Sequence, residues 1–247
     1  MKKQKFEYWV DQKPYEIEVF GNTKYGKDEL LIDKEVNIIK NSSFSEEGYT
    51  VVPFLSKDLI KSLKNQIMII LNRHIEPVIG KKYSLKTLSN YHLDVNDVQH
   101  NKIISSIYNN SGKGINIEEA EFDFSVIEER VSQICNNPLL TCKMPRKKSK
   151  QFFIRIIRPN PNIDNNPPHR DVWIPRLKNA VNIHFIISGN SNKSTLSILP
   201  GSHLLKENQI KRTDEGALIN GIQFTVPSVV GSSKPLYLIR PRMLKDD

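Results

Sequence analysis

Cysteine is scarce in this chain of 247 residues, which contains only Cys135 and Cys142. Two cysteines cannot form a zinc quartet, and a single pair is too few for a small domain that depends on disulfide bonds. The scarcity favours a reducing compartment, and a chain of this length can bury a sizeable core without cross-links. Neither a zinc-ribbon protein nor a disulfide-rich secreted module fits this composition.

Long apolar runs are also missing. The longest, at residues 67–71 (IMIIL), is far shorter than the roughly 20 residues that a membrane-spanning helix needs. The basic start of the chain, MKKQKFEYWVDQK, is not followed by the apolar segment of a signal peptide. These absences predict a cytoplasmic protein without a membrane partner.

Acidic residues are the minority charge. The chain has 36 lysines and arginines against 27 aspartates and glutamates, which gives a net charge of +9. Residues 143–159 (KMPRKKSKQFFIRIIRP) carry seven basic residues and no acid. We interpret this stretch as a solvated loop that enters a strand. A basic nucleic-acid-binding module is the alternative, but no helix-turn-helix, zinc finger or aromatic RNA-binding motif accompanies the stretch, so nucleic acid is not an expected partner.

Periodicity predicts helices mainly in the first half of the chain and short strands in the second. Alternating segments on either side of residues 11–14 (DQKP) predict a hairpin, and residues 48–54 (GYTVVPF) indicate a buried strand. Amphipathic spacing predicts helices at residues 56–74, with Ser56 as the N-cap, and at about 94–108 and 117–135. Further strands are expected at residues 151–159, 180–188, 194–199, 222–226 and 235–239.

We expect one domain over residues 1–247. Within it, residues 1–40 form a hairpin extension, residues 42–145 contain a strand and helices, and residues 146–247 form a mostly β core. Several short strands late in the chain are typical of a β-sandwich or barrel. The helices of the first half could cover one face of that sheet structure.

Residues 167–173 (PPHRDVW) place His169 and Asp171 one residue apart. The two prolines favour extended geometry, in which side chains i and i+2 project to the same face. His169 and Asp171 would then point together, with the intervening arginine pointing away. One imidazole and one carboxylate offer two adjacent ligands to a divalent metal, and a second histidine would complete the facial triad that binds Fe(II). The pattern is weak evidence by itself, because His92 and Asp94 repeat it.

The segments that follow this pair strengthen the metal interpretation. A strand candidate at residues 180–188 (AVNIHFIIS), a polar turn and residues 195–203 (TLSILPGSH) come in this order. The combination resembles the phytanoyl-CoA dioxygenase family of Fe(II)- and 2-oxoglutarate-dependent oxygenases. Residues 43–67 are similar to that family's opening strand and amphipathic helix, so the resemblance covers roughly residues 42–205 and is strongest over 151–205.

The resemblance implies a mostly β fold with N-terminal helices, built on a cupin-like double-stranded β-helix, or jelly roll. His169 and Asp171 would be the first two iron ligands. With O2 as the oxidant, the cosubstrate 2-oxoglutarate would be decarboxylated to succinate and CO2 while a small-molecule substrate, which the resemblance does not identify, is hydroxylated. His184 lies near a position that is commonly aromatic in the family, which makes it a candidate for the cosubstrate pocket. As a lone histidine in an apolar strand, however, it is more often a buried core residue, which is the interpretation we favour.

Two features of the family are missing from the sequence. The family has a distal histidine on a later strand and, shortly after it, an arginine or lysine that pairs with 2-oxoglutarate, whereas no histidine follows His203 here. We interpret this as a domain that is incomplete at its C-terminus. A metal-free relative, acting as an inactive binding protein, is one alternative. The other takes His203 as the third ligand and Arg212 as the cosubstrate arginine, although a histidine in the PGSH turn is expected to bond to the backbone.

Trp173 and Arg158 are candidates for substrate binding. On a regular strand Trp173 would share the face of the metal pair, although a core role is equally compatible with it. Arg158 could meet an anionic substrate or simply be solvated.

The other histidines carry weaker signals. At the second His-x-Asp pattern, Asp94 or Asn96 suits a helix N-cap better than a metal ligand. His74 and His100 fall on predicted helices without obvious partners, and we expect both at the surface. The sequence predicts no oligomeric state.

Overall fold

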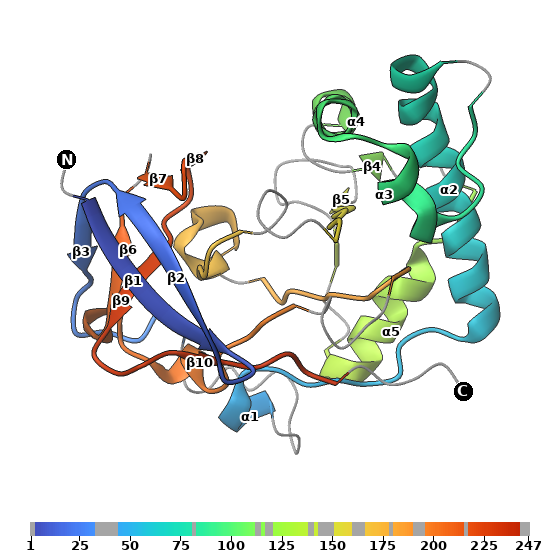
Figure 1. Ribbon diagram of the computed structural model, residues 1–247. Coiled ribbons are helices and arrows are strands. Elements are labelled where there is room, and N and C mark those ends of the chain that lie inside the picture. Colours follow the sequence, from blue (N-terminus) through green and yellow to red (C-terminus); the bar gives the residue numbers. More distant parts are fainter. Residues whose placement is uncertain are drawn as a thin grey trace. The chain divides into compact units, whose positions relative to one another are not determined.

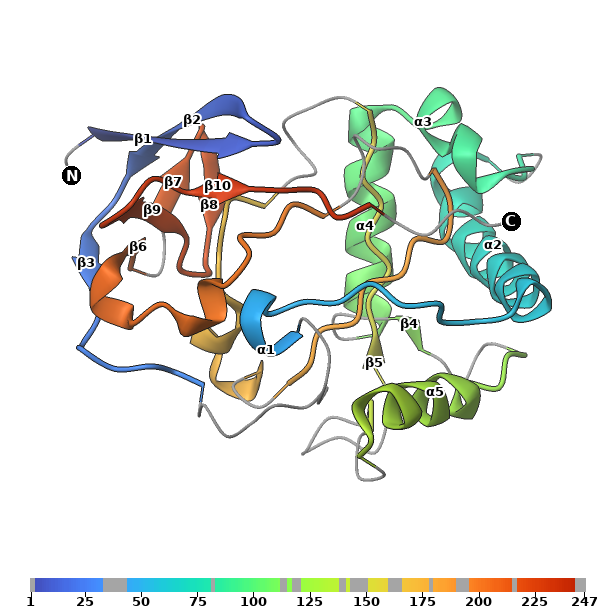
Figure 2. The same ribbon diagram turned by 90° about the horizontal axis from the view of Figure 1, so that it is seen from below.

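The computed structural model describes residues 3–32, 44–80, 83–111, 115–116, 121–137, 141–142, 151–159, 166–177, 180–189, 196–214 and 217–242 (Figures 1 and 2). The chain divides into two compact units, each built from separate segments. The first unit, here called the β unit, comprises Met1–Val51, Asn165–Phe185 and Thr195–Leu244. The second, the helical unit, comprises Val52–Asp164, Ile186–Ser194 and Lys245–Asp247.

A long antiparallel hairpin opens the β unit and confirms the first sequence prediction. Strand β1 (Lys3–Val10) pairs along its whole length with β2 (Lys13–Phe20). The connecting residues Asp11 and Gln12 both have positive φ, 49° and 66°. Two successive residues in this region make the tight turn whose twist matches that of the flanking strands.

Two open sheets form the rest of the β unit. The larger has the order β10-β1-β2-β7-β8, and β10 pairs with β1 in parallel while the other neighbours are antiparallel. Its later strands are β7 (Ala217–Ile219), β8 (Ile222–Phe224) and β10 (Tyr237–Leu238). The smaller, antiparallel sheet has the order β3-β6-β9, from Thr23–Tyr25, Ile210–Thr213 and Val229–Ser232. Neither sheet closes into a barrel among the described residues. Figure 1 shows the β1–β2 hairpin beside the C-terminal strands.

Both sheets contribute to the same apolar core. Val10 and Leu238 of the larger sheet pack with Ile210 and Val229 of the smaller one. A second cluster joins Val230 of β9 to four buried residues of the larger sheet: Ile17, Val19, Ala217 and Ile219. The sheets of this unit therefore share one interior, and burying their inner faces is the main source of stability for such an arrangement.

Helices dominate the helical unit. Helix α2 (Lys57–Ile79) begins where the Ser56 side chain accepts a hydrogen bond from the Leu59 amide at 3.3 Å, which confirms the predicted N-cap. Helix α4 (Asp97–Ser111) is preceded by α3 (Tyr91–Asp94) and capped by Asn96, whose side chain accepts from the Gln99 amide at 2.9 Å. Helix α5 (Ser125–Cys135) is shorter than the predicted segment, of which residues 117–120 lie outside the described residues.

The core of the helical unit lies between α2, α3 and α4, which Figures 1 and 2 show side by side. Ile75 and Ile103 are both 0% exposed at its centre. Ile154 and Ile156, from the extended segment after the short β4–β5 pair (Ile115–Asn116 and Gln151–Phe152), pack against it. Ile75 and Ile103 thus lie on buried faces of amphipathic helices, whereas Val98, an apolar residue of the predicted helix at 94–108, is 64% exposed.

Several predicted strands are wrong. Residues 180–188 are all described and none belongs to a strand, and of residues 151–159 only Gln151 and Phe152 pair with a neighbour. In the described part of 194–199, only Ile198 forms a bridge, to Ile239. These segments have the composition of strands, but a strand also needs a neighbouring chain for its backbone groups.

The buried strand predicted at residues 48–54 is also absent. The side chain of Arg130 donates hydrogen bonds to the carbonyls of Phe54 and Pro53, at 3.1 and 2.9 Å. Pro53 has no amide hydrogen to offer a neighbouring strand. The side chain of Arg130, on α5, thus donates to carbonyl groups that would accept hydrogen bonds from a neighbouring strand in a sheet. Most of the basic stretch at 143–159 falls at residues 143–150, outside the described residues.

Candidate functional site

His169 and Asp171 face each other in the β unit. Their intervening residue, Arg170, has extended backbone angles (φ −120°, ψ 120°), so the two side chains project to the same side, as predicted. His169 Nε2 lies 3.3 Å from Asp171 Oδ1. The segment is tied to β9 by a hydrogen bond of 2.7 Å from the Val229 amide to the Pro168 carbonyl. The predicted common orientation of the two side chains is therefore confirmed.

The donor atoms of the pair suit a shared divalent cation. His169 Nδ1 lies 2.8 Å from the Pro167 carbonyl, so this nitrogen must carry the proton and donate it. That bond leaves Nε2 to act as a ligand once its own proton is lost, which is how metal-binding histidines are usually oriented. Two ligands at about 2.1 Å from a metal and at right angles to each other lie about 3 Å apart. The observed separation is close to that value. In the described part of the chain, no third His, Cys, Asp or Glu completes a group with them.

Asp171 is held in its ionised form by its neighbours. The hydrogen bond from His169 is the main cause that lowers the pKa of Asp171, and burial opposes it. The Asn182 amide also donates a hydrogen bond to Asp171 Oδ2, and the charge of His184 acts in the same direction. A carboxylate that is charged and already faces an imidazole is a suitable metal ligand.

His184 is exposed, so the interpretation as a buried core residue is wrong. It lies two residues beyond Asn182, and its charge acts on Asp171. This position keeps it a candidate for the cosubstrate side of the site. Sequence reasoning missed Asn182, although its spacing of two residues from His184 could have pointed to it.

Trp173 does not lie on a regular strand. Residues Asp171–Trp173 form one 3-10 turn, so the strand argument that gave Trp173 the face of the metal pair does not apply. The indole Nε1 donates a hydrogen bond of 2.8 Å to Glu207, and the ring packs against the apolar core shared by the two sheets. These contacts support the core role that the sequence left open. Glu207 is 3% exposed, and no sequence signal pointed to it.

His203, in the PGSH turn, is engaged by the backbone. Its Nε2 lies 3.1 Å from the carbonyl of Ser45, as expected for a turn histidine. Gly48 (φ 75°) lies against the ring, and a Cβ at this position would collide with it. Arg212, on β6, points to Glu207, with 3.7 Å between Nη1 and Oε2. Neither residue joins His169 and Asp171 in a ligand group among the described residues.

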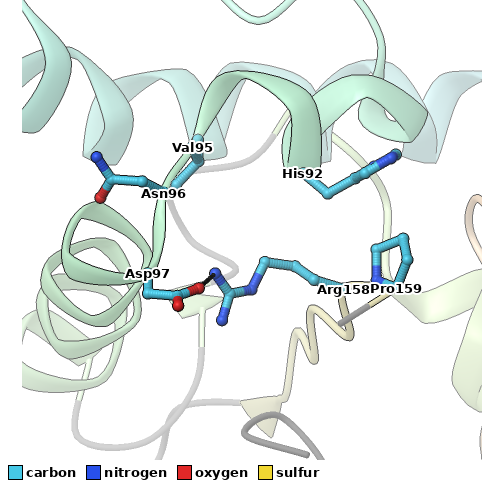
Figure 3. A pocket seen from close by; sticks show the side chains of 6 residues that line it. All are labelled: His92, Val95, Asn96, Asp97, Arg158 and Pro159. Atoms are coloured by element: carbon cyan, nitrogen blue, oxygen red, sulfur yellow. Dashed lines mark hydrogen bonds and ion pairs between the residues drawn. The ribbon is translucent and has the colours of Figure 1, made fainter. Parts of the chain in front are cut away.

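Arg158 lines a hollow of about 360 Å³ in the helical unit (Figure 3). Its guanidinium is buried and donates from Nη1 to Asp97 Oδ1 at 2.6 Å, so the solvated alternative is wrong. In Figure 3, His92, Val95 and Asn96 lie above the ion pair, and Pro159 lies beside Arg158. The hollow therefore combines a fixed positive group, a carboxylate and an imidazole, and has room for a small polar molecule.

His74 and His100 are not free surface residues. His100 is 5% exposed, and its Nδ1 lies 3.0 Å from the hydroxyl of Tyr91. His74 Nδ1 lies 2.9 Å from the Ser106 hydroxyl. The surface position expected for His100 is thus wrong, whereas His74 is only partly buried, and each ring joins two helical segments.

Comparison with family models, curated proteins and solved structures finds no match to this chain. None of the helices in the described ranges has the length and apolar character to cross a bilayer.

Proposed function

We propose that His169 and Asp171 hold Fe(II), and that the chain is a 2-oxoglutarate-dependent dioxygenase similar to the phytanoyl-CoA dioxygenase family. The observation that carries the proposal is the 3.3 Å approach of His169 Nε2 to Asp171 Oδ1, with Nδ1 fixed by the Pro167 carbonyl. Both donors are of the kind that non-haem iron takes. When bound there, iron and 2-oxoglutarate would, together with O2, supply the oxidative chemistry that hydroxylates a small molecule.

The residues around the pair have definable roles in this proposal. Pro167 orients the imidazole through its carbonyl, and Asn182 orients the carboxylate through its amide. His184 is proposed to contact the cosubstrate. Because the described residues contribute two ligands, we expect the chain to bind iron weakly and to turn over slowly.

A jelly roll is the fold that we propose for the β unit. Two mostly antiparallel sheets that share one apolar interior support it. The sheets are open, and the parallel pairing of β1 with β10 lets the N-terminal hairpin extend the larger sheet.

A binding protein without catalytic activity is the second candidate. The hollow beside Arg158 favours it, because it has room for a small molecule and contains an ion pair that is already formed. In that case His169 would act as a charged partner of Asp171 rather than as a metal ligand.

Anaerobic addition of Fe(II) and then 2-oxoglutarate separates the two candidates. The dioxygenase proposal predicts quenching of tryptophan fluorescence that needs both additions and is lost in Asp171→Ala. No response to either addition would contradict it and favour the binding protein. Rapid succinate formation would contradict the expected slow turnover.

A further inference from the structure

Glu207 is an acid buried behind the His169–Asp171 pair. It begins a short 3-10 turn (Glu207–Gln209), and only 3% of its side chain is exposed. Its amide donates to the Glu29 carbonyl at 2.9 Å, and its own carbonyl accepts from the Gly26 amide at 3.1 Å. A Cβ on Gly26 would collide with Glu207, so the two backbones are in close contact. The carboxylate is therefore held on a fixed piece of backbone.

Arg170, which precedes the Asp171–Trp173 turn, and Trp173, its last residue, both reach this one carboxylate. Arg170 Nη1 donates to Oε1 at 2.5 Å, and Trp173 Nε1 donates to Oε2 at 2.8 Å. Arg170 precedes Asp171 in the chain and Trp173 follows it by two residues. Each carboxylate oxygen thus fixes one side of the short segment that carries the metal pair.

Arg212, on β6, lies close to both Glu207 and Trp173. Its Nη1 lies 3.7 Å from Glu207 Oε2, and its guanidinium carbon lies 4.9 Å from the centre of the Trp173 ring. The ring of Trp173 therefore has a carboxylate at its edge and a cation on its face. These contacts leave Trp173 few other orientations.

Because Glu207 holds Arg170 and Trp173, it also restricts the orientation of His169 and Asp171, which lie on the other face of the same segment. In extended backbone, neighbouring side chains project to opposite sides, so the orientation of Arg170 determines where His169 and Asp171 point. An ion pair buried this deeply adds little stability compared with apolar packing, but it fixes orientation well.

We propose that Glu207 is a positioning residue, which sets the separation of the two metal ligands by clamping Arg170 and Trp173. This inference rests on the proposed function, because it assumes that His169 and Asp171 bind a metal. Glu207 itself does not touch the metal. The chemistry it serves is the binding of one divalent cation of the Fe(II) class.

Titration with Co²⁺ alone, followed by its ligand-field absorption, tests the inference. Glu207→Gln keeps the size of the side chain and removes its charge, and we expect roughly tenfold weaker Co²⁺ binding and an altered spectrum. Trp173→Phe removes only the indole donor, and we expect a smaller loss. Asp11→Asn is the control, because it removes the charge from a more exposed 2.5 Å carboxylate–arginine contact of the β unit, to Arg240, and should leave the affinity unchanged.

The titrations are run below the unfolding temperature of each variant, so that a loss of stability does not pass for a loss of affinity. Unchanged affinity and spectrum in folded Glu207→Gln would overturn the inference while leaving the proposed function intact. If Glu207→Gln does not fold, unchanged binding by Trp173→Phe overturns it instead. Absence of Co²⁺ binding by the unaltered chain contradicts the proposed function, and the inference with it.

Discussion

His169 Nε2 lies 3.3 Å from Asp171 Oδ1 because one extended residue separates them. The same pattern recurs at His92 and Asp94, but there it lies in helix α3, where side chains two positions apart diverge by about 200°. Asp94 instead accepts a hydrogen bond of 2.6 Å from the Tyr83 hydroxyl. Backbone conformation thus separates a candidate metal pair from a structural aspartate, although the two motifs look alike in the sequence.

Tyr83 is expected to ionise later than an ordinary tyrosine. Burial, followed by the hydrogen bond to Asp94, raises its pKa from 10.0 to about 12. Because the folded pKa is the raised one, its contribution to stability is complete below the unfolded pKa and is lost as the pH rises towards about 12. Ultraviolet absorbance during an alkaline titration should show a late phenolate step that is absent in Tyr83→Phe. Tyr25→Phe, at an exposed position, should retain that step, and its loss in both variants would contradict the assignment.

Truncating a side chain at the centre of the helical core should lower the stability of the protein more than truncating one at its surface. Ile103 is 0% exposed, so Ile103→Ala is expected to lower the free energy of unfolding by about 2–5 kcal/mol. Ile69, 45% exposed on α2, provides the control, and Ile69→Ala should change it by no more than about 0.5 kcal/mol. Urea denaturation measures both. Equal losses of unfolding free energy in Ile103→Ala and Ile69→Ala would mean that α2 and α4 do not pack as described.

The ion pair of Arg158 should contribute to stability as well as lining the hollow. Asp97→Asn takes the carboxylate away from a guanidinium that is 6% exposed, and we expect a loss of about 1–3 kcal/mol. Adding Arg158→Met should recover part of the loss, because it also removes the buried charge. Glu16→Gln, which breaks the exposed pair with Lys5, should cost much less. Thermal unfolding of the unaltered chain and of the three variants measures these losses. An unfolding temperature that is unchanged in Asp97→Asn would show that the ion pair does not contribute to stability.

Features of the fold that depend on residues close together in the sequence could be predicted. Features that depend on distant segments of the chain could not. The N-cap of Ser56 and the hairpin turn at Asp11 and Gln12 depend on a few neighbouring residues, so their sequence signals were sufficient. The strand predicted at 180–188 and most of the one predicted at 151–159 failed to form, because a strand depends on a neighbour from elsewhere in the chain.

The same distinction holds for the candidate site. The orientation of His169 and Asp171 follows from the extended backbone of Arg170, because side chains two positions apart project to the same side of an extended segment. Glu207 could not be found in this way, because its role comes from contacts with residues more than thirty positions away. The burial of His100 was missed because its partner, the Tyr91 hydroxyl, becomes a neighbour only when α3 and α4 fold together.

Anaerobic calorimetric titration with Fe(II) tests the metal pair most directly. We expect one weak site in the unaltered chain, with affinity reduced at least roughly tenfold in His169→Ala and in Asp171→Ala. His92→Ala removes the histidine of the helical His-x-Asp pattern and should bind iron as the unaltered chain does. Iron affinity that survives in both His169→Ala and Asp171→Ala, or that is lost in His92→Ala, would contradict the assignment of the site.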